Sequence, residues 1–173
     1  MKELYNIEII LTNDKVIRLQ LESKYAPKSV ENFINLVKQN YFDGTIFHRI
    51  IENFMIQTGG YKVEENTLMQ MPEIASSEGE FASNGHPENI LKHELGVISM
   101  ARTSDPNSAT SQFFICAATC PWLDGQYAAF GKTVDEESNQ IVLEVSQMQT
   151  GNLGGGFTDF PYELIGIKTI KLI

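Results

Sequence analysis

One segment of the sequence sets two polar side chains among large apolar ones with the alternation of a β-strand. Successive side chains of a strand point to opposite faces, so Phe47, Arg49 and Ile51 share a face, as Met55 and Gln57 do further along. An arginine and a glutamine beside phenylalanine and methionine form an apolar floor with a few fixed donors, as in many small-ligand sites. The alternative is a solvated arginine on an exposed edge strand.

A second segment, residues 111–115, alternates in the same way. Gln112 and Phe114 share one face, whereas Phe113 and Ile115 point to the other. One phenylalanine therefore enters the core. The other either lines a groove or is buried on the second face of a covered strand, and alternation does not decide between these arrangements.

A third group of large apolar residues surrounds a predicted turn. Asp124-Gly125 is typical of a tight turn, and it brings Trp122, Leu123 and Tyr127 together on a surface loop. Large apolar residues on a surface often mark a contact site. A hydrophobic clamp that only stabilises the fold is an equally good interpretation.

The sequence has no motif for nucleophilic or metal-dependent chemistry. Its histidines, His48, His86 and His93, are far apart, and no H-x-x-x-H, C-x-x-C or G-x-S-x-G spacing occurs. The triglycine at 154–156 lacks the lysine of a phosphate-binding loop. We therefore expect no metal, no cofactor, and structural or surface roles for the histidines. A serine hydrolase would need a serine, a histidine and an acid to converge from distant segments.

The composition is that of an ordinary globular domain with an acidic surface. The chain has 173 residues, 22 acidic against 13 basic side chains and a net charge of -9, which argues against a nucleic-acid partner. Its length fits a single domain over residues 1–173. No run approaches the roughly 18 apolar residues of a membrane span, and the first residues lack the apolar stretch of a secretory signal. We therefore expect a cytoplasmic monomer whose Cys116 and Cys120 are reduced, buried and small apolar in character.

Apolar periodicity predicts short strands and two helices. Residues 4–11 and 16–22 alternate with a period of two, as in an antiparallel hairpin with one solvated face. A helical stripe follows Pro27, and a second helix over 134–148 begins with three acidic residues. The other predicted strands cover residues 46–57, 97–101, 113–117, 128–131 and 164–173. Residues 61–94 are predicted to be loops with at most one short strand, and residues 151–160 a glycine-rich loop.

The order of these elements limits the fold class. The strands do not alternate with helices, which excludes a doubly wound parallel sheet. Many short strands with only two helices favour an antiparallel barrel or sandwich to which the helices are appended.

Four blocks of the sequence closely resemble those of cyclophilins, the cyclosporin-binding peptidyl-prolyl cis-trans isomerases, and they occur in the family's order. They are Phe47-His48-Arg49-Ile50-Ile51 with Phe54-Met55-Ile56-Gln57, residues 96–101, residues 107–115, and Trp122-Leu123-Asp124-Gly125 before Phe130-Gly131. The predicted helix with Glu31-Asn32-Phe33 matches as well. The resemblance covers nearly the whole chain. It implies a mainly β fold, a closed eight-stranded antiparallel β-barrel capped by two α-helices.

The resemblance also implies roles for single residues. Arg49 resembles the catalytic arginine of the family, with Phe54 and Gln57 as further members of the catalytic group. The residues expected to bind substrate are Met55, Ala101, Arg102, Thr103, Gln112, Phe114, Trp122, Leu123 and Tyr127. Within this set, the walls of the proline pocket are Phe54, Met55, Phe114 and Leu123, whereas Ala101, Arg102 and Gln112 border the groove for the residues before proline. Trp122 resembles the tryptophan that favours cyclosporin.

The expected substrates are proline-containing peptides and unfolded or partly folded proteins, with cyclosporin as an inhibitor. Isomerisation breaks no covalent bond, so it requires no metal or cofactor. A module that only binds proline-containing segments of a partner is the alternative. Such a module would need the pocket but not the arginine.

Three positions depart from the common family pattern. Tyr127 stands where many members have histidine, Arg102-Thr103 replaces Asn-Ala, and Glu52-Asn53 replaces Pro-Gly. The segment Met100 to Thr103 is more similar to bacterial cyclophilins. Tyr127 still provides an aromatic wall with a polar tip. We therefore expect isomerase activity with an altered substrate preference.

Overall fold

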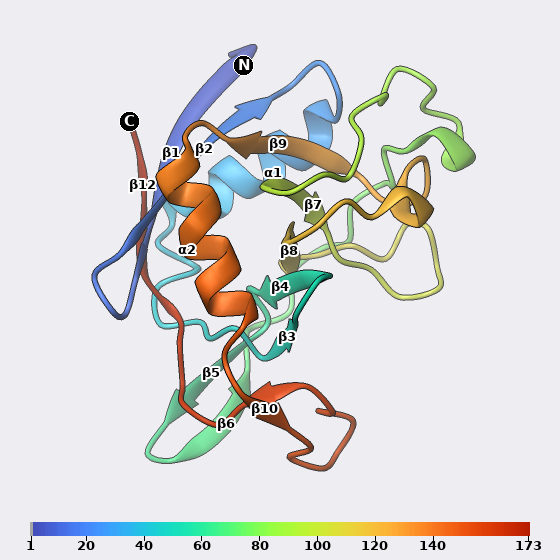
Figure 1. Cartoon of the computed structure of the whole chain (residues 1–173). Helices are drawn as coiled ribbons and strands as arrows, with labels where there is room; N and C mark the ends of the chain where they lie inside the picture. The colour runs from blue at the N-terminus through green and yellow to red at the C-terminus, as the bar shows by residue number, and fades with distance from the viewer. Residues whose placement is uncertain (1) are drawn as a thin grey trace.

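The computed structural model describes residues 2–173, and its largest element is a curled antiparallel sheet of eight strands (Figure 1). The strands follow the order β12-β1-β2-β9-β7-β8-β4-β3. Their bounds are Leu4–Leu11 (β1), Val16–Glu22 (β2), Arg49–Ile51 (β3), Met55–Thr58 (β4), Val97–Met100 (β7), Phe113–Cys116 (β8), Ala129–Thr133 (β9) and Ile167–Leu172 (β12). The mainly β class and the antiparallel pairing predicted from the sequence are confirmed.

The N-terminal hairpin shows how the alternating sequence builds this sheet. β1 and β2 pair along their whole length, from Leu4 opposite Glu22 to Ile10 opposite Val16. The inward side chains of the two strands are at most 1% exposed, namely Ile7, Ile9, Leu11, Ile17, Leu19 and Leu21. Both strands occupy the predicted ranges, because one face is buried and a slip by one residue would expose it.

The eight strands do not close into the barrel that the family resemblance implies. The edge strands β3 and β12 are not paired with each other, because Ile50 of β3 donates its N–H to the carbonyl of Asp159 at 3.0 Å. The segments that precede the two edge strands meet instead. Ile46 forms an isolated bridge with Gly166, and the N–H of Phe47 donates to the carbonyl of Ile165 at 2.9 Å. The sheet is therefore an open, curled half-barrel.

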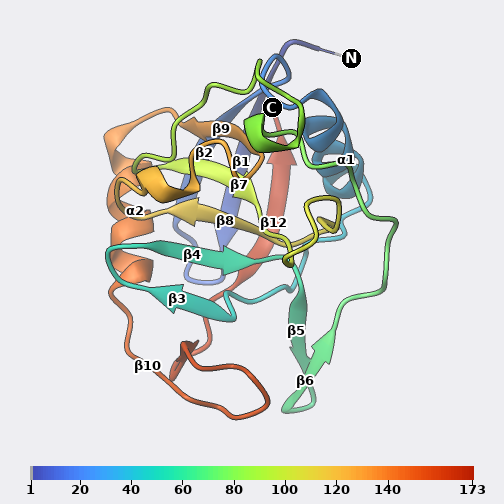
Figure 2. The same cartoon turned by 90° about the vertical axis from the view of Figure 1, so that its right-hand side faces the viewer.

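Two α-helices occur in the described residues, α1 (Pro27–Lys38) and α2 (Glu136–Ser146), at opposite ends of the curled sheet (Figure 2). Pro27 lies in the first turn of α1, where its missing N–H costs no hydrogen bond. α2 is shorter than the predicted 134–148. Its N-cap is Asp135, whose carboxylate accepts a hydrogen bond from the N–H of Ser138 at 2.8 Å, so the helix begins at the next residue.

Aromatic rings join α1 to the inner face of the sheet. The ring of Phe33 on α1 lies 5.1–5.4 Å from the rings of Phe42, Phe113 and Phe130. All four side chains are at most 1% exposed. Burial of so much aromatic surface is a major stabilising contribution in a chain of this size, and it fixes the inner face of β8.

Residues 61–94 contain more structure than the sequence predicts. β5 (Tyr61–Glu64) and β6 (Thr67–Gln70) form a separate hairpin, and a 3₁₀ turn, η1, covers Ala82–Asn84. The hairpin has no buried face, so its residues show no apolar alternation. Its two-residue loop, Glu65 and Asn66, has positive φ at both positions, as primed hairpin turns require.

The remaining elements are short. The predicted glycine-rich loop is bracketed by a two-residue pairing of β10 (Thr150–Gly151) with β11 (Phe160–Pro161), and a second 3₁₀ turn, η2, covers Pro121–Leu123. None of the helices in the described part of the chain has the length and apolar character that a membrane crossing requires.

Candidate active site

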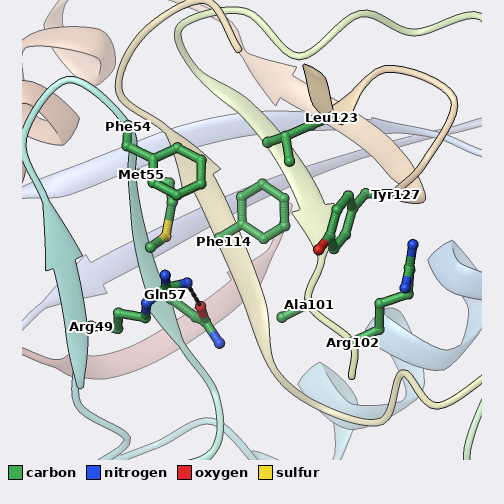
Figure 3. A pocket seen from close by; sticks show the side chains of 9 residues that line it. All are labelled: Arg49, Phe54, Met55, Gln57, Ala101, Arg102, Phe114, Leu123 and Tyr127. Atoms are coloured by element: carbon green, nitrogen blue, oxygen red, sulfur yellow. Dashed lines mark hydrogen bonds between the residues drawn. The ribbon is translucent and has the colours of Figure 1, made fainter. Parts of the chain in front are cut away.

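The β3–β4 hairpin presents Arg49 and Gln57 side by side on the outer face of the sheet. The two residues are paired in register, and the guanidinium Nη1 donates to Gln57 Oε1 at 3.4 Å (Figure 3). Gln57 in turn donates through Nε2 to Gln112 Oε1 at 2.9 Å. Gly60 leaves room for Gln112, because a Cβ at position 60 would lie 2.5 Å from Gln112 Nε2. A row of two amides therefore holds the exposed arginine.

This row borders a small pocket of about 120 Å³ (Figure 3). Nine of the twelve predicted site residues line it, namely Arg49, Phe54, Met55, Gln57, Ala101, Arg102, Phe114, Leu123 and Tyr127. Met55, Phe114 and Leu123 are nearly fully buried, and they belong to an apolar cluster separate from the main core. The pocket thus has a preformed apolar floor with polar groups on one side.

A tight turn places Phe54 at the pocket wall. The N–H of Phe54 donates to the carbonyl of Ile51 at 3.1 Å, and Asn53 has a φ of 61°. Asparagine tolerates this left-handed conformation better than most residues other than glycine. Glu52-Asn53 therefore preserves a turn at the position where Pro-Gly is common in the family. The ring of Phe54 lies 5.9 Å from the guanidinium carbon of Arg49.

Strand β8 settles the question that alternation left open. Phe113 points into the main core and Phe114 into the pocket cluster, and both are buried. The ring of Phe114 stacks on the imidazole of His93, with 6.0 Å between centroids and 19° between planes. The ring of Phe114 is thus held in place by the stacked imidazole of His93.

His93 is itself held by hydrogen bonds on both ring nitrogens. Nδ1 lies 3.1 Å from Asp124 Oδ1, and Nε2 lies 2.9 Å from Ser99 Oγ. Burial lowers the pKa of His93, although the Asp124 carboxylate opposes this shift. The sequence does not predict this support, because His93, Ser99 and Asp124 come from separate segments and no spacing motif links them. These contacts fit the structural role expected for His93.

Tyr127 forms the wall opposite Phe54 and Met55, and Arg102 lies against it (Figure 3). The Tyr127 ring meets Phe114 edge-on at 5.8 Å. The guanidinium carbon of Arg102 lies 4.5 Å from the centre of the Tyr127 ring and 4.9 Å from that of Phe81. Arg102 also donates to the carbonyl of Gln126 through Nε at 3.1 Å and Nη2 at 2.7 Å. Arg102 therefore braces the wall and directs its guanidinium away from the pocket.

Three predicted residues lie outside this pocket. Thr103 and Gln112 line an adjoining cavity of about 150 Å³, which shares Gln57, Ala101 and Arg102 with it. Ser108 and Thr110, which the sequence analysis did not single out, complete that cavity. Trp122 lines neither cavity. It is 61% exposed, and its ring lies 5.8 Å from that of Phe54 at the pocket edge.

Cysteine and histidine side chains do not line this pocket. Cys116 and Cys120 are both buried, as expected, and burial raises the pKa of both thiols. His48 is also buried, and burial together with the neighbouring Arg49 lowers its pKa to about 4. Among residues 2–173, no three histidine, cysteine, aspartate or glutamate side chains gather closely enough to hold a metal ion.

Comparison with known proteins agrees with this architecture. A family model described as cyclophilin type peptidyl-prolyl cis-trans isomerase matches residues 7–172. Fold and sequence together place the chain among the peptidyl-prolyl cis-trans isomerases, enzymes that interconvert the two isomers of X-Pro bonds. Within that class, the chain belongs to the cyclophilin family, as the sequence resemblance indicated.

Named relatives and a solved structure support this assignment. Peptidyl-prolyl cis-trans isomerase A of Dickeya dadantii is 39% identical over 170 residues, which is 95% of this chain and 83% of that protein. An isomerase of Streptomyces antibioticus is 36% identical over 91% of this chain and 92% of its own length. The crystal structure of a cyclophilin-type isomerase of Cryptosporidium parvum, obtained in the presence of the dipeptide Ala-Pro, has a TM-score of 0.76 and 28% identity, covering 97% of this chain and 98% of that one.

Proposed function

We propose that this isomerase holds the substrate proline in the pocket lined by Phe114 and stabilises the twisted amide with Arg49. One observation carries the proposal. The exposed guanidinium of Arg49 is held by Gln57 at the edge of a preformed apolar pocket, 3.4 Å from the amide oxygen. A cation fixed beside an apolar pocket suits a substrate that is an apolar ring attached to a polar amide.

The chemistry explains why these residue types suffice. The barrier is the partial double bond of the amide, about 18–20 kcal/mol, and uncatalysed X-Pro isomerisation takes tens to hundreds of seconds. In the twisted state, resonance is lost and the prolyl nitrogen becomes pyramidal with a localised lone pair. A guanidinium N–H donated to that nitrogen stabilises the twisted state more than either planar isomer. Stabilisation by about 7 kcal/mol would accelerate the reaction by roughly five decades.

Each side chain then has a defined task. Arg49 donates the hydrogen bond, and it suits this task because it stays charged and its fork is rigid. Phe54, Met55, Phe114 and Leu123 grip the ring while the preceding residue rotates. Gln57 orients Arg49, and Tyr127 closes the far wall with an aromatic ring.

The adjoining cavity is proposed to take the residues that precede proline. It shares Gln57, Ala101 and Arg102 with the proline pocket, so a peptide can cross from one to the other without leaving the surface. The Cryptosporidium relative was crystallised in the presence of Ala-Pro, a dipeptide in which one residue precedes proline. We propose proline-containing peptides and partly folded proteins as the substrates of this chain.

Cyclosporin is proposed as an inhibitor that spans the pocket edge at Trp122. The indole is exposed and lies next to Phe54, where a ligand larger than a dipeptide would meet it. Trp122 is the one tryptophan of the chain, so its fluorescence reports on this edge alone. Titration with cyclosporin should give a saturable fluorescence change and a matching calorimetric isotherm. Neither signal at high micromolar drug would contradict this part of the proposal.

The decisive experiment replaces Arg49 with alanine. We expect kcat/KM on an Ala-Pro tetrapeptide, measured by a protease-coupled assay, to fall by about 100-fold or more, the usual effect of removing a donor to the reacting group. Arg18→Ala is the matched control, because Arg18 pairs with Glu8 on β1, which is not part of the pocket, and should change little. Turnover of Arg49→Ala at the level of the natural chain would overturn the mechanism. A natural chain that binds proline peptides without accelerating their isomerisation would support the binding-module alternative.

A further inference from the structure

A serine, a histidine and an aspartate from separate segments of the chain meet behind the proline pocket. Ser99 lies on β7, His93 in the loop before β7, and Asp124 directly after η2. Asp124 Oδ1 lies 3.1 Å from Nδ1 of the His93 imidazole, and Nε2 of the same ring lies 2.9 Å from Ser99 Oγ. The order of acid, imidazole and hydroxyl is that of a serine hydrolase triad. The convergence that a hydrolase would need is therefore present.

Burial rules out hydrolase chemistry at this triad. Ser99 and His93 are both 0% exposed, so a substrate carbonyl cannot reach the Ser99 hydroxyl. Neither residue lines the proline pocket, whereas Phe114, which stacks on His93, does. Any effect of the triad on the isomerase reaction must therefore pass through the ring of Phe114.

The hydrogen bonds of the triad determine which nitrogen of His93 carries the proton. Asp124 Oδ1 accepts the backbone N–H of His93 at 2.6 Å as well as the contact from Nδ1. Because a carboxylate only accepts hydrogen bonds, Nδ1 carries the ring proton and Nε2 has a lone pair. The Ser99 hydroxyl therefore donates to Nε2. Burial lowers the pKa of His93 from 6.5, so the ring is neutral at pH 7 and above and keeps this tautomer.

Both the main chain and the ring of His93 are tied to the segment that ends at Asp124. The carbonyl of His93 accepts the N–H of Cys120 at 2.8 Å, and Asp124 holds the N–H and the ring. The imidazole cannot tilt without breaking a buried hydrogen bond, and an unpaired polar group in the interior is costly. The His93 ring is therefore fixed from two sides.

The orientation of the imidazole matters for the pocket because Phe114 lies flat against it. The planes of the two rings differ by 19°, and the other neighbour of Phe114, Tyr127, meets it edge-on. Phe114 lies between Met55 and Tyr127 in the pocket (Figure 3). A tilt of the imidazole would therefore displace the middle of the apolar floor.

We propose that Asp124 is a positioning residue of this isomerase, which holds the His93 ring against Phe114 and thereby fixes the floor of the proline pocket. The inference rests on the proposed function, because it requires the substrate proline to lie on Phe114. A floor that is fixed before the substrate binds holds the proline ring while the amide twists. Small displacements of a group that positions a substrate can lower the rate strongly.

The first test measures the tautomer of His93 in the natural chain and needs no variant that alters the site. Long-range ¹H–¹⁵N NMR spectra at pH 7.5 identify the protonated nitrogen in each of the three histidines. We expect His93 to be neutral and protonated at Nδ1, and His93→Gln assigns its signals by their loss. A ring protonated at Nε2 would overturn the inference, because Asp124 would then not hold it.

Two substitutions of Asp124 separate positioning from folding. Asp124→Asn keeps an oxygen that accepts from both N–H groups of His93, so kcat/KM on an Ala-Pro tetrapeptide should stay within about threefold of that of the natural chain. Asp124→Leu removes this acceptor and should lower kcat/KM about 10-fold, as expected when a binding group is displaced. Urea unfolding shows beforehand that each variant is folded under the assay conditions.

Asp135→Leu is the matched control. The Asp135 carboxylate also accepts a backbone N–H, that of Ser138 at 2.8 Å, but it caps α2 and does not line the pocket. Its loss should lower the midpoint of urea unfolding and leave kcat/KM unchanged. A purely structural role of Asp124 predicts this same result for Asp124→Leu.

A double-mutant cycle tests whether Asp124 acts through Phe114. Phe114→Leu keeps an apolar floor without a ring that can stack on His93. In that background, Asp124→Leu should change kcat/KM, measured by exchange NMR spectroscopy, by less than about twofold. The effect of Asp124→Leu on urea unfolding should persist in both backgrounds, because the N–H groups of His93 lose their acceptor in each.

The outcomes that contradict the inference differ from those that contradict the proposed function. Natural kcat/KM in folded Asp124→Leu, or an equal loss with and without the Phe114 ring, overturns the positioning role and leaves the isomerase intact. Labelling of Ser99 by a fluorophosphonate overturns it as well, since the serine would then be reachable and reactive. If Asp124→Leu does not fold, the tautomer and a loss of more than about 10-fold in Asp124→Asn still decide against the inference. No catalysed exchange of an Ala-Pro peptide by the natural chain overturns the proposed function instead.

Discussion

The guanidinium carbon of Arg102 lies 4.5 Å from the centre of the Tyr127 ring, while Nε and Nη2 of the same group donate to the carbonyl of Gln126. This arrangement couples a residue of the groove to the far wall of the proline pocket. Arg102→Ala should let Tyr127 move, because it removes cation–π contacts with Tyr127 and Phe81, each worth about 0.5–1 kcal/mol, and three hydrogen bonds. We expect kcat/KM on an Ala-Pro tetrapeptide to fall by about two- to fivefold.

Arg102→Lys distinguishes charge from geometry. Lysine keeps the positive charge but not the planar fork that reaches both the ring and the carbonyl. It should therefore resemble alanine rather than arginine in kcat/KM. Full activity of Arg102→Lys would indicate that only the charge matters at this position.

The amide row behind Arg49 makes a second prediction. Gln57→Leu removes the acceptor of the Arg49 guanidinium and should lower kcat about 10-fold with a smaller change in KM, since Gln57 orients the donor. Gln112→Leu should lower kcat more weakly, because Gln112 reaches Arg49 only through Gln57.

A double-mutant cycle checks this order. The double variant with leucine at both positions should be no worse than Gln57→Leu alone, because the two residues act in series. Fully additive losses would show that Gln112 affects catalysis by a separate route, such as direct contact with the residues before proline.

The sequence predicts this site better than it predicts what surrounds the site. The strand alternation correctly placed Met55 and Gln57 on one face, because a period of two is a local property. Its grouping of Phe47 with Arg49 was wrong, because Phe47 precedes β3 and is buried in the main core whereas Arg49 is exposed. The stacking of His93 on Phe114 could not be predicted from the sequence. His93, Asp124 and Ser99 come together only when β7, β8 and η2 pack.

The fold predictions failed for the same reason, namely where the sequence carries no local pattern. β1 and β2 match their predicted ranges because each has a buried face. The β5–β6 hairpin has none, so only its turn residues could have revealed it. The open edge of the sheet depends on Asp159, a loop residue more than 100 positions from its partner Ile50, and no local pattern records that pairing.

The exposed position of Trp122 separates drug binding from turnover. Trp122 does not line the proline pocket, and its ring lies 5.8 Å from that of Phe54 at the pocket edge. Trp122→Phe should weaken cyclosporin binding by about 10-fold or more, because an aromatic anchor of an interface carries a large share of its affinity. The same change should lower kcat/KM on a tetrapeptide by less than about threefold. Calorimetry and the coupled assay measure the two effects, and equal losses in both would contradict the separation.

Acid should destabilise the fold through His48. Its pKa is lowered from 6.5 to about 4, first by burial and then by Arg49. Between these two values the unfolded chain binds the proton and the folded chain does not. The free energy of unfolding is therefore complete above pH 6.5 and falls by about 3 kcal/mol as the pH drops to 4. Burial of His93 lowers its pKa too and adds a loss of the same sign.

Urea unfolding at pH 7 and pH 5 measures this dependence. His48→Gln should flatten the pH dependence, and the remaining slope should come mainly from His93. His86→Gln is the control, because His86 lies against the exposed Glu78 and Glu88 rather than in a buried site. A slope that is the same in His48→Gln and in the natural chain would contradict the assignment to His48.

Helix α1 should depend on a carboxylate that lies 51 residues further along the chain. The N-cap of α1, Ala26, has no side-chain hydrogen bond, whereas the buried Glu80 accepts from the N–H and hydroxyl of Ser29 at 2.7 and 2.8 Å. Glu80→Ala leaves these buried donors unpaired, so the free energy of unfolding should fall by about 1–3 kcal/mol. Glu78→Ala is the control, because Glu78 pairs with Lys28 in solvent and its loss should cost less. Urea unfolding measures both, and equal losses would mean that α1 needs only nearby negative charge rather than the buried hydrogen bonds of Glu80.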